Sequence, residues 1–318
     1  MDNWPRLGEL LVKLPDFAQN ALIVELTSRK RWIKMLTKGQ TNQLLGYPPD
    51  ARLLIINMDD FGMAHAINQA TLDTFKRGVA TSCTLMVPCP WALHGMHLLK
   101  ENPDLPFGVH LTAVSESRYY RWRPLSSPEK VPSLMGEKGY FYSEERIPEF
   151  LEQVNLAELE LEFRAQIEAV LAEGLKPTHL DSHCGTHTRR EDIFDMTVQL
   201  AREYGLALRV SERPLIEKLQ RQGYASNDYD ILDSYRLETE AKPILYPKLL
   251  RELPAGLSEW AIHPGIGNAE LQAINPTWPV RQADYDFFTS SEAQIIIKEE
   301  GIILLNYKPL QELWRKKS

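Results

Sequence analysis

The stretch Leu53-Leu54-Ile55-Ile56-Asn57-Met58-Asp59-Asp60-Phe61-Gly62 decides the fold of this chain. Its apolar first half is typical of a strand that is buried on both faces, as strands of parallel sheets are. Two carboxylates follow directly, and buried carboxylates need a compensating partner such as a metal ion. Because neighbouring side chains of a strand point to opposite sides, we expect one aspartate to bind a metal and the other to act as a base. The alternative is a helix N-cap with an additional surface aspartate.

Length and composition allow a large core and argue against some classes of partner and compartment. The chain has 318 residues, of which 43% are hydrophobic, and this length suits an α/β barrel. The net charge is −7 and no basic stripe is present, so we expect no nucleic-acid partner. Three cysteines form no disulfide framework, and neither a signal peptide nor a membrane-spanning apolar run is found. We therefore expect a cytoplasmic protein.

Apolar strands alternate with helical patterns from residue 51 to the end of the chain, which favours a parallel sheet. Predicted strands cover residues 53–58, 80–87, 107–111, 177–180, 206–210, 260–263 and 302–305, and predicted helices cover 63–77, 91–100, 156–173, 191–204, 214–222 and 290–299. The fold class is α/β, a distorted (β/α) barrel of parallel strands, either complete or incomplete. Residues 1–50 are expected to form an N-terminal helical extension, and 51–318 a single barrel domain with insertions at about 112–150 and 223–257.

Polar side chains follow the predicted strands at their carboxyl ends. They are Asp59 and Asp60, His110, the group Asp181, His183 and His187, then Arg209 and His263. In parallel α/β folds these strand ends converge on one face, where ligands bind. Carboxylates and imidazoles together suit a divalent metal such as Zn²⁺, Mn²⁺, Fe²⁺ or Mg²⁺, and three protein ligands leave positions for water and substrate. A lone histidine at a strand end is more often a surface or hydrogen-bonded residue than a ligand.

Several motifs resemble the YdjC-like carbohydrate deacetylases, a family that includes chitooligosaccharide and hopanoid-associated deacetylases. They are Asn57-Met58-Asp59-Asp60-Phe61-Gly62, Val79-Ala80-Thr81-Ser82, Met86-Val87-Pro88, Gly108-Val109-His110-Leu111, Pro177-Thr178-His179-Leu180-Asp181-Ser182-His183 and His263-Pro264-Gly265. The match runs in order from about residue 52 to residue 305. Departures are Met58, where the family usually has a small residue, and Cys184, where it often has His or Gln. Cys184 is either a thiolate ligand or a small packing residue.

The resemblance implies a distorted barrel and metal-dependent removal of N-acetyl groups from amino sugars. By motif position, Asp60, His110 and His183 are the metal ligands, Mg²⁺ or Zn²⁺ is the cofactor, Asp59 is the general base and His263 is the acid. The implied reaction is attack of metal-activated water on the acetamide carbonyl.

Other candidate site residues come from their residue types alone. Arg209 either pairs with Asp59 or anchors a loop. We assign His187 to substrate binding. Trp91, Tyr120 and Trp122, with Tyr119, are candidates to stack on sugar rings, and the alternative is that they pack the loop onto the barrel.

Two further functions stay open at this point. One is a metal-dependent hydrolase of another bond, such as a phosphoester or a cyclic amide. The other is a non-catalytic barrel that binds carbohydrate. The expected partner is an N-acetylated carbohydrate substrate, and the pattern allows a homodimer.

Overall fold

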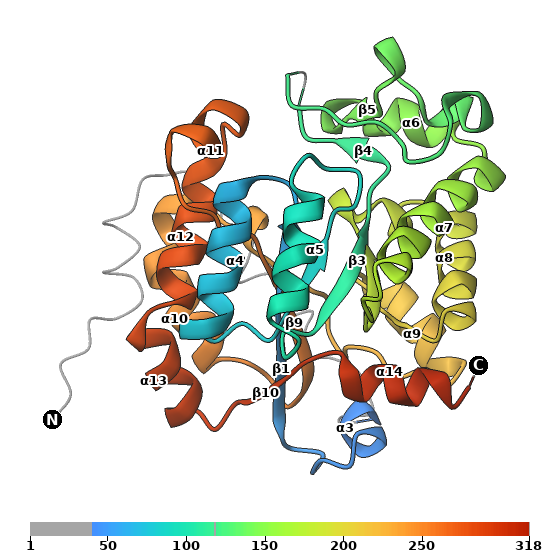
Figure 1. The fold of residues 1–318 in the computed structure, drawn as a ribbon. Helices are drawn as coiled ribbons and strands as arrows, with labels where there is room; N and C mark the ends of the chain where they lie inside the picture. The colour runs from blue at the N-terminus through green and yellow to red at the C-terminus, as the bar shows by residue number, and fades with distance from the viewer. Residues whose placement is uncertain (1–39, 118, 318) are drawn as a thin grey trace, which may run out of the picture.

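The computed structural model describes residues 40–117 and 119–317. Within them, one curled sheet of parallel strands is surrounded by helices (Figure 1). The predicted distorted barrel is therefore confirmed in its incomplete form. The helices expected in residues 1–39 lie outside the described residues, and only the short helix α3 (Gln40–Leu44) of the expected extension falls within them.

The main sheet contains every strand that the sequence predicts, and one more. Its strands are β1 (Arg52–Phe61), β2 (Ser82–Leu85), β3 (Phe107–Leu111), β6 (His179–Ser182), β7 (Ala207–Leu208), β8 (Leu232–Asp233), β9 (Gly256–Ile262) and β10 (Ile303–Leu305). Their order is β7-β6-β3-β2-β1-β9-β8, with β10 beside β1. The additional strand, β8, is too short to show an apolar pattern. Near the outer edges, Ile231 N–H donates to the Ser211 carbonyl at 3.2 Å, and no ladder joins β7 to β8 in the described chain.

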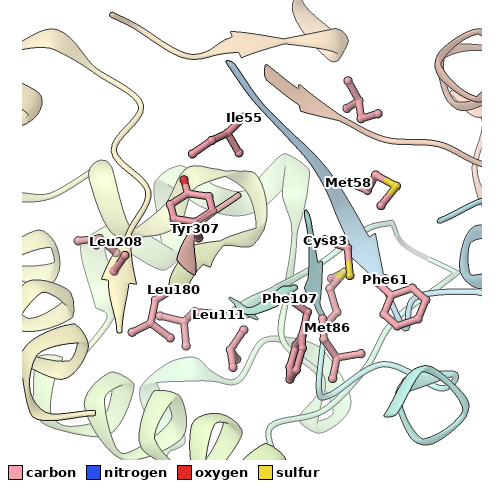
Figure 2. Close-up of a cluster of buried hydrophobic side chains, with 14 of the residues drawn as sticks. Ile55, Met58, Phe61, Cys83, Met86, Phe107, Leu111, Leu180, Leu208 and Tyr307 are labelled. Atoms are coloured by element: carbon pink, nitrogen blue, oxygen red, sulfur yellow. The ribbon is translucent and has the colours of Figure 1, made fainter. Parts of the chain in front are cut away.

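Strand β1 is the centre of the sheet, as its apolar run predicts. It pairs with β9 along Arg52–Met58 on one side, and with β10 and then β2 on the other. All neighbours are parallel, so β1 is buried on both faces and its side chains contribute to the core. Figure 2 shows Ile55, Met58 and Phe61 of β1 in one cluster of buried apolar side chains.

The helices cover the outside of this sheet (Figure 1). They are α4 (His65–Arg77), α5 (Ala92–Glu101), α6 (Ile147–Gln153), α7 (Leu156–Ala172), α8 (Glu191–Glu203), α9 (Arg213–Arg221), α10 (Lys242–Arg251), α11 (Ala269–Ile274), α12 (Trp278–Phe288), α13 (Ser291–Glu299) and α14 (Lys308–Arg315). Each helix that the sequence predicts after residue 50 is present. None of the helices in the described chain is both long and apolar enough to cross a membrane.

The stretch 223–257 is more regular than its sequence predicts. It contains β8 and the helix α10, which begins with a proline in its first turn and holds Pro247 inside it. Prolines usually mark turns or helix ends, so they hid this helix from pattern analysis. Tertiary packing decides the outcome, because Leu245, Tyr246 and Leu250 of α10 are buried.

The stretch 112–150 has little regular structure, as expected. It holds the two-residue strands β4 (Val114–Ser115) and β5 (Tyr142–Ser143), four 3₁₀ turns and the start of α6. It lies beyond the carboxyl end of β3, at the end of the sheet where the strands point (Figure 1). This insertion therefore stands over the edge at which the predicted site residues gather.

Candidate active site

A cavity of about 430 Å³ opens at the carboxyl ends of the strands. The predicted catalytic and metal-binding residues all line it: Asp59, Asp60, His110, His183, Arg209 and His263. They come from β1, β3, the loop after β6, the end of β7 and the end of β9. The convergence predicted from parallel strand ends is what brings them together.

The turn at the end of β1 separates the roles of the two aspartates. The β1–β2 register shifts between Met58 and Phe61, and Asp60 has a positive φ of 67°. Asn57 donates to Asp59 Oδ1 at 2.8 Å, which orients that carboxylate. The two carboxylates thus contact different partners, through a kink with a left-handed residue rather than through simple strand alternation.

Asp60, His110 and His183 form one compact group of potential metal ligands. Asp60 Oδ1 lies 3.4 Å from His110 Nε2 and 3.2 Å from His183 Nδ1. The three donor atoms lie within 4.8 Å of one another, and all three side chains are buried. One carboxylate oxygen and two imidazole nitrogens at this spacing could hold a divalent cation.

Asp181 orients the first of these histidines. His110 Nδ1 lies 2.7 Å from Asp181 Oδ1, so His110 Nε2 is left facing Asp60. Burial alone would lower the pKa of His110, but the Asp181 carboxylate, helped by Asp60, raises it to about 9. A histidine with a carboxylate on its outer nitrogen is the usual arrangement behind a metal-binding imidazole.

A buried arginine compensates the charge of Asp60. Arg281, on α12, places NH2 2.7 Å from Asp60 Oδ2. Burial opposes ionisation of Asp60, yet Arg281 and the two histidines hold its pKa well below the usual value. Asp60 is therefore a carboxylate with one oxygen on Arg281 and the other toward the histidines.

Arg209 pairs with Asp59, which was one of the two interpretations of this residue. Its NH1 and NH2 donate to the two oxygens of Asp59 at 2.6 and 2.8 Å. NH1 also lies 2.8 Å from Asp181, and Nε donates to Glu259 at 2.7 Å. A second group of potential ligands consists of Asp59, His110 and Asp181. The guanidinium of Arg209 compensates the negative charge of its two carboxylates, so no second cation is needed there.

His263 lies across the cavity from the metal-binding group. Its Nδ1 is 2.9 Å from Ser234 Oγ, and its Nε2 is 3.8 Å from Asp59 Oδ2, too far for a direct hydrogen bond. The ring of Tyr235 meets it edge-on at 4.5 Å between centroids. His263 therefore presents Nε2 to the same space as Asp59.

Of the four residues predicted to bind substrate, His187 lines the cavity and the other three do not. His187 is buried, with Nδ1 2.6 Å from Ser182 Oγ and Nε2 2.9 Å from the Arg209 carbonyl, so both ring nitrogens are already engaged. Trp122 is also buried and donates Nε1–H to the Val114 carbonyl at 3.0 Å. This geometry favours a packing role for both side chains.

Tyr120 and Trp91 make other contacts. Tyr120 donates its hydroxyl to the Met63 carbonyl, and Trp91 packs against His65 at 4.9 Å between ring centroids. Neither of them is among the described residues that line the cavity, and the aromatic residue that does line it is Tyr235. The alternative that the loop aromatics pack onto the barrel fits the structure better.

Sequence reasoning missed Glu116, Arg281 and Tyr235. Glu116 and Tyr235 come from segments with no strand–helix pattern of their own. Arg281 comes from α12, a helix that the sequence pattern did not reveal. Cys184 lies beside His183 but belongs to neither group of potential metal ligands among the described residues, which favours the packing residue over the thiolate ligand.

A family model described as YdjC-like protein matches residues 53–299. The chain belongs to the YdjC-like family. This YdjC-like protein is 33% identical over 264 residues to a carbohydrate deacetylase of Enterococcus faecalis, with 81% of this chain and 97% of that protein covered. It is 35% identical over 262 residues to a carbohydrate deacetylase of Thermus thermophilus, with 78% and 90% covered.

A solved structure is similar over the whole barrel. It is the crystal structure of a putative cellobiose-phosphate cleavage protein from Enterococcus faecalis, with a TM-score of 0.71 and 32% identity. The similarity covers 82% of this YdjC-like chain and 99% of that one. The incomplete parallel barrel is therefore a fold shared within the family.

Proposed function

We propose that this protein is a metal-dependent carbohydrate deacetylase, which hydrolyses the acetamide of an N-acetylated amino sugar to an amine and acetate. The observation that carries the proposal is the cluster Asp60, His110 and His183 next to a second carboxylate, Asp59, that lies outside the cluster in the same cavity. The names of the carbohydrate deacetylases to which the chain is similar support the substrate class.

The cluster fits a divalent cation, and Mg²⁺ or Zn²⁺ is our choice. Asp60 Oδ1, His110 Nε2 and His183 Nδ1 would hold the ion, and three protein donors leave positions open for water and substrate. When bound, the ion supplies Lewis-acid chemistry that polarises the acetamide carbonyl and makes water more acidic.

Asp59 acts as the general base in this proposal. Arg209 and Asn57 fix its two oxygens through hydrogen bonds of 2.6 to 2.8 Å, so the carboxylate is held in one orientation. From this position Asp59 takes the proton of the attacking water. Its two oxygens both accept from Arg209, and Asp59 does not belong to the group Asp60, His110 and His183.

His263 acts as the general acid. Ser234 holds its Nδ1, and its Nε2 stands 3.8 Å from Asp59, on the cavity side. His263 therefore delivers a proton to the departing nitrogen of the amino sugar, which leaves as an amine.

Acetate release is the test of this proposal. The purified protein is incubated with N-acetylglucosamine oligomers and Mg²⁺ or Zn²⁺, and acetate is measured with and without a chelator. We expect acetate only when metal is present. Release of phosphate from aryl phosphates instead would favour a phosphoesterase, and sugar binding without acetate release would favour the non-catalytic barrel.

We also infer a cytoplasmic location, because Cys83, Cys89 and Cys184 are all free thiols and free thiols suit a reducing compartment. The homodimer stays a prediction.

A further inference from the structure

Each histidine of the metal-binding cluster has a second carboxylate near its outer ring nitrogen. For His110 this carboxylate is Asp181, 2.7 Å from Nδ1. For His183, Nδ1 faces Asp60 at 3.2 Å and Nε2 lies 3.3 Å from Glu116 Oε2. A carboxylate thus lies near the outer nitrogen of each ring, although Glu116 belongs to no recognised motif. The Asp181 contact is a hydrogen bond, whereas Glu116 lies at ion-pair distance from His183 without a hydrogen bond.

We propose that Glu116 is a positioning residue that fixes the ring of His183 for metal binding. A carboxylate on the outer nitrogen sets the tautomer and the orientation of an imidazole and makes it a better ligand. The inference rests on the proposed function, since it assumes that Asp60, His110 and His183 hold a divalent cation.

Glu116 is itself held in place by two residues of later segments. Asn275 donates Nδ2–H to Glu116 Oε1 at 2.5 Å, and Arg281 NH2 lies 3.5 Å from the same oxygen. Its side chain is only 10% exposed. A buried carboxylate that spans these partners is fixed in position, which a residue must be if it is to orient another.

A second contact from the same segment confines His183. Trp122, also in the 112–150 insertion, meets the His183 ring at an interplanar angle of 62° with centroids 6.1 Å apart. Glu116 and Trp122 thus approach His183 from one insertion, at the ring nitrogen and at the ring itself. The insertion contributes to metal binding in this proposal, in addition to standing over the cavity.

Metal titration of Glu116→Gln tests the inference. Calorimetry with Zn²⁺ and Mg²⁺ is done on the full chain at one fixed pH, beside wild type and the control Glu212→Gln. Glu212 also lines the cavity but contacts none of the proposed ligands, so its variant should bind metal like wild type. Glu116→Gln should lose about 10- to 100-fold in affinity, the range typical of such partners.

Two further measurements separate positioning from folding and from direct ligation. Asn275→Ala removes the hydrogen bond that holds Glu116 and should weaken metal binding by a smaller factor in the same direction. The visible absorption bands of the Co²⁺-loaded Glu116→Gln protein should shift in wavelength. Their intensity should equal that of the Co²⁺-loaded wild type, because the set of metal ligands is unchanged. A spectrum that shows one protein ligand fewer would make Glu116 a ligand and overturn the inference.

The two proposals fail in distinguishable ways. Wild-type affinity in Glu116→Gln overturns the inference and leaves the deacetylase proposal intact. A wild-type protein that binds no divalent metal overturns both.

Discussion

At the scale of single residues, Asp59 and Asp60 are adjacent in sequence yet meet different partners. Asp59 is paired with Arg209, whereas Asp60 faces His110 and His183. The sequence predicts two roles for these carboxylates. That prediction rests on the alternation of side chains along a strand. In the structure, the positive φ of 67° at Asp60 separates the two carboxylates instead.

Substitution of each aspartate by asparagine should therefore impair a different step, metal binding for one and turnover for the other. Asp60→Asn should weaken metal binding, because a neutral amide is a poorer ligand for a divalent cation. Asp59→Asn should keep metal binding nearly intact and lose about 10²- to 10⁴-fold in turnover, because an amide cannot take the proton of water. Calorimetric titration with metal and acetate release are measured for both variants.

Added metal provides the control for this pair. Excess metal should restore part of the activity of Asp60→Asn and none of that of Asp59→Asn. If Asp59→Asn loses the metal and Asp60→Asn keeps it, the two roles are exchanged. If both variants keep full activity, the proposed mechanism is wrong.

His187 makes the stability of the fold dependent on pH. Burial lowers the pKa of His187 to about 4, whereas an unfolded histidine titrates near 6.5. Below about pH 6.5 the unfolded chain binds a proton at His187, whereas the folded chain keeps this imidazole neutral. The free energy of unfolding therefore falls as the pH falls below about 6.5. Between pH 7 and pH 5 this residue alone should cost roughly 2 kcal/mol.

Urea unfolding at pH 7 and pH 5 measures this cost. In His187→Gln the titrating group is gone, so the loss of stability over the same interval should be smaller by roughly 2 kcal/mol. Equal losses in wild type and variant would show that His187 is not buried in its neutral form.

At the scale of elements, the site residues at the strand ends could be predicted, whereas those supplied by an insertion and by α12 could not. The apolar run of β1 and the order of the other strands predict which faces are buried and where His110, Arg209 and His263 meet. Glu116 and Arg281 could not be predicted, because tertiary contacts of an irregular insertion and of α12 place them beside Asp60 and His183. Local patterns carry no information about such contacts.

The pairing of β3 with β6 depends on a glycine. The ring of His179 stacks on Tyr307 with centroids 3.6 Å apart, and its opposite side lies over Gly108. A Cβ at Gly108 would come within 2.6 Å of the His179 carbonyl oxygen and 2.7 Å of the ring. Tyr307 in turn donates to Glu259, which accepts from Arg209, so this packing extends to the site.

Gly108→Ala should therefore destabilise the protein by about 1–3 kcal/mol or more, because the added methyl has no room. Thermal and urea unfolding measure the loss. The control is Gly174→Ala, whose added methyl meets no atom within 4 Å and bears only the strain of a positive φ, about 1 kcal/mol. A smaller loss in Gly108→Ala than in the control would contradict the close packing of β3 against His179.

At the scale of the whole molecule, the candidate site is built from residues between Asp59 and Arg281. The segment before β1 contacts the sheet at its far side from the cavity, through α3 (Figure 1). Thr41 donates to the Ser226 carbonyl at 2.7 Å and lies 2.9 Å from Asp228, and Asn42 donates to the carbonyls of Pro48 and Ala51. These contacts of α3 lie outside the cavity. That residues 1–50 as a whole pack outside the barrel or support a dimer, and take no part in catalysis, stays a prediction.

Two truncations test this division of roles. A chain that starts at residue 40 retains Thr41 and Asn42, so we expect it to keep the turnover of the full chain. A chain that starts at Tyr47 loses Thr41, one of several donors to the buried Asp228, which should lower the free energy of unfolding by about 1–3 kcal/mol. It should still release acetate below its unfolding temperature, because the cavity is unchanged. Light scattering of the three proteins shows whether a dimer depends on the removed residues. A chain starting at residue 40 that folds and binds metal like the full protein but releases no acetate would contradict the assignment.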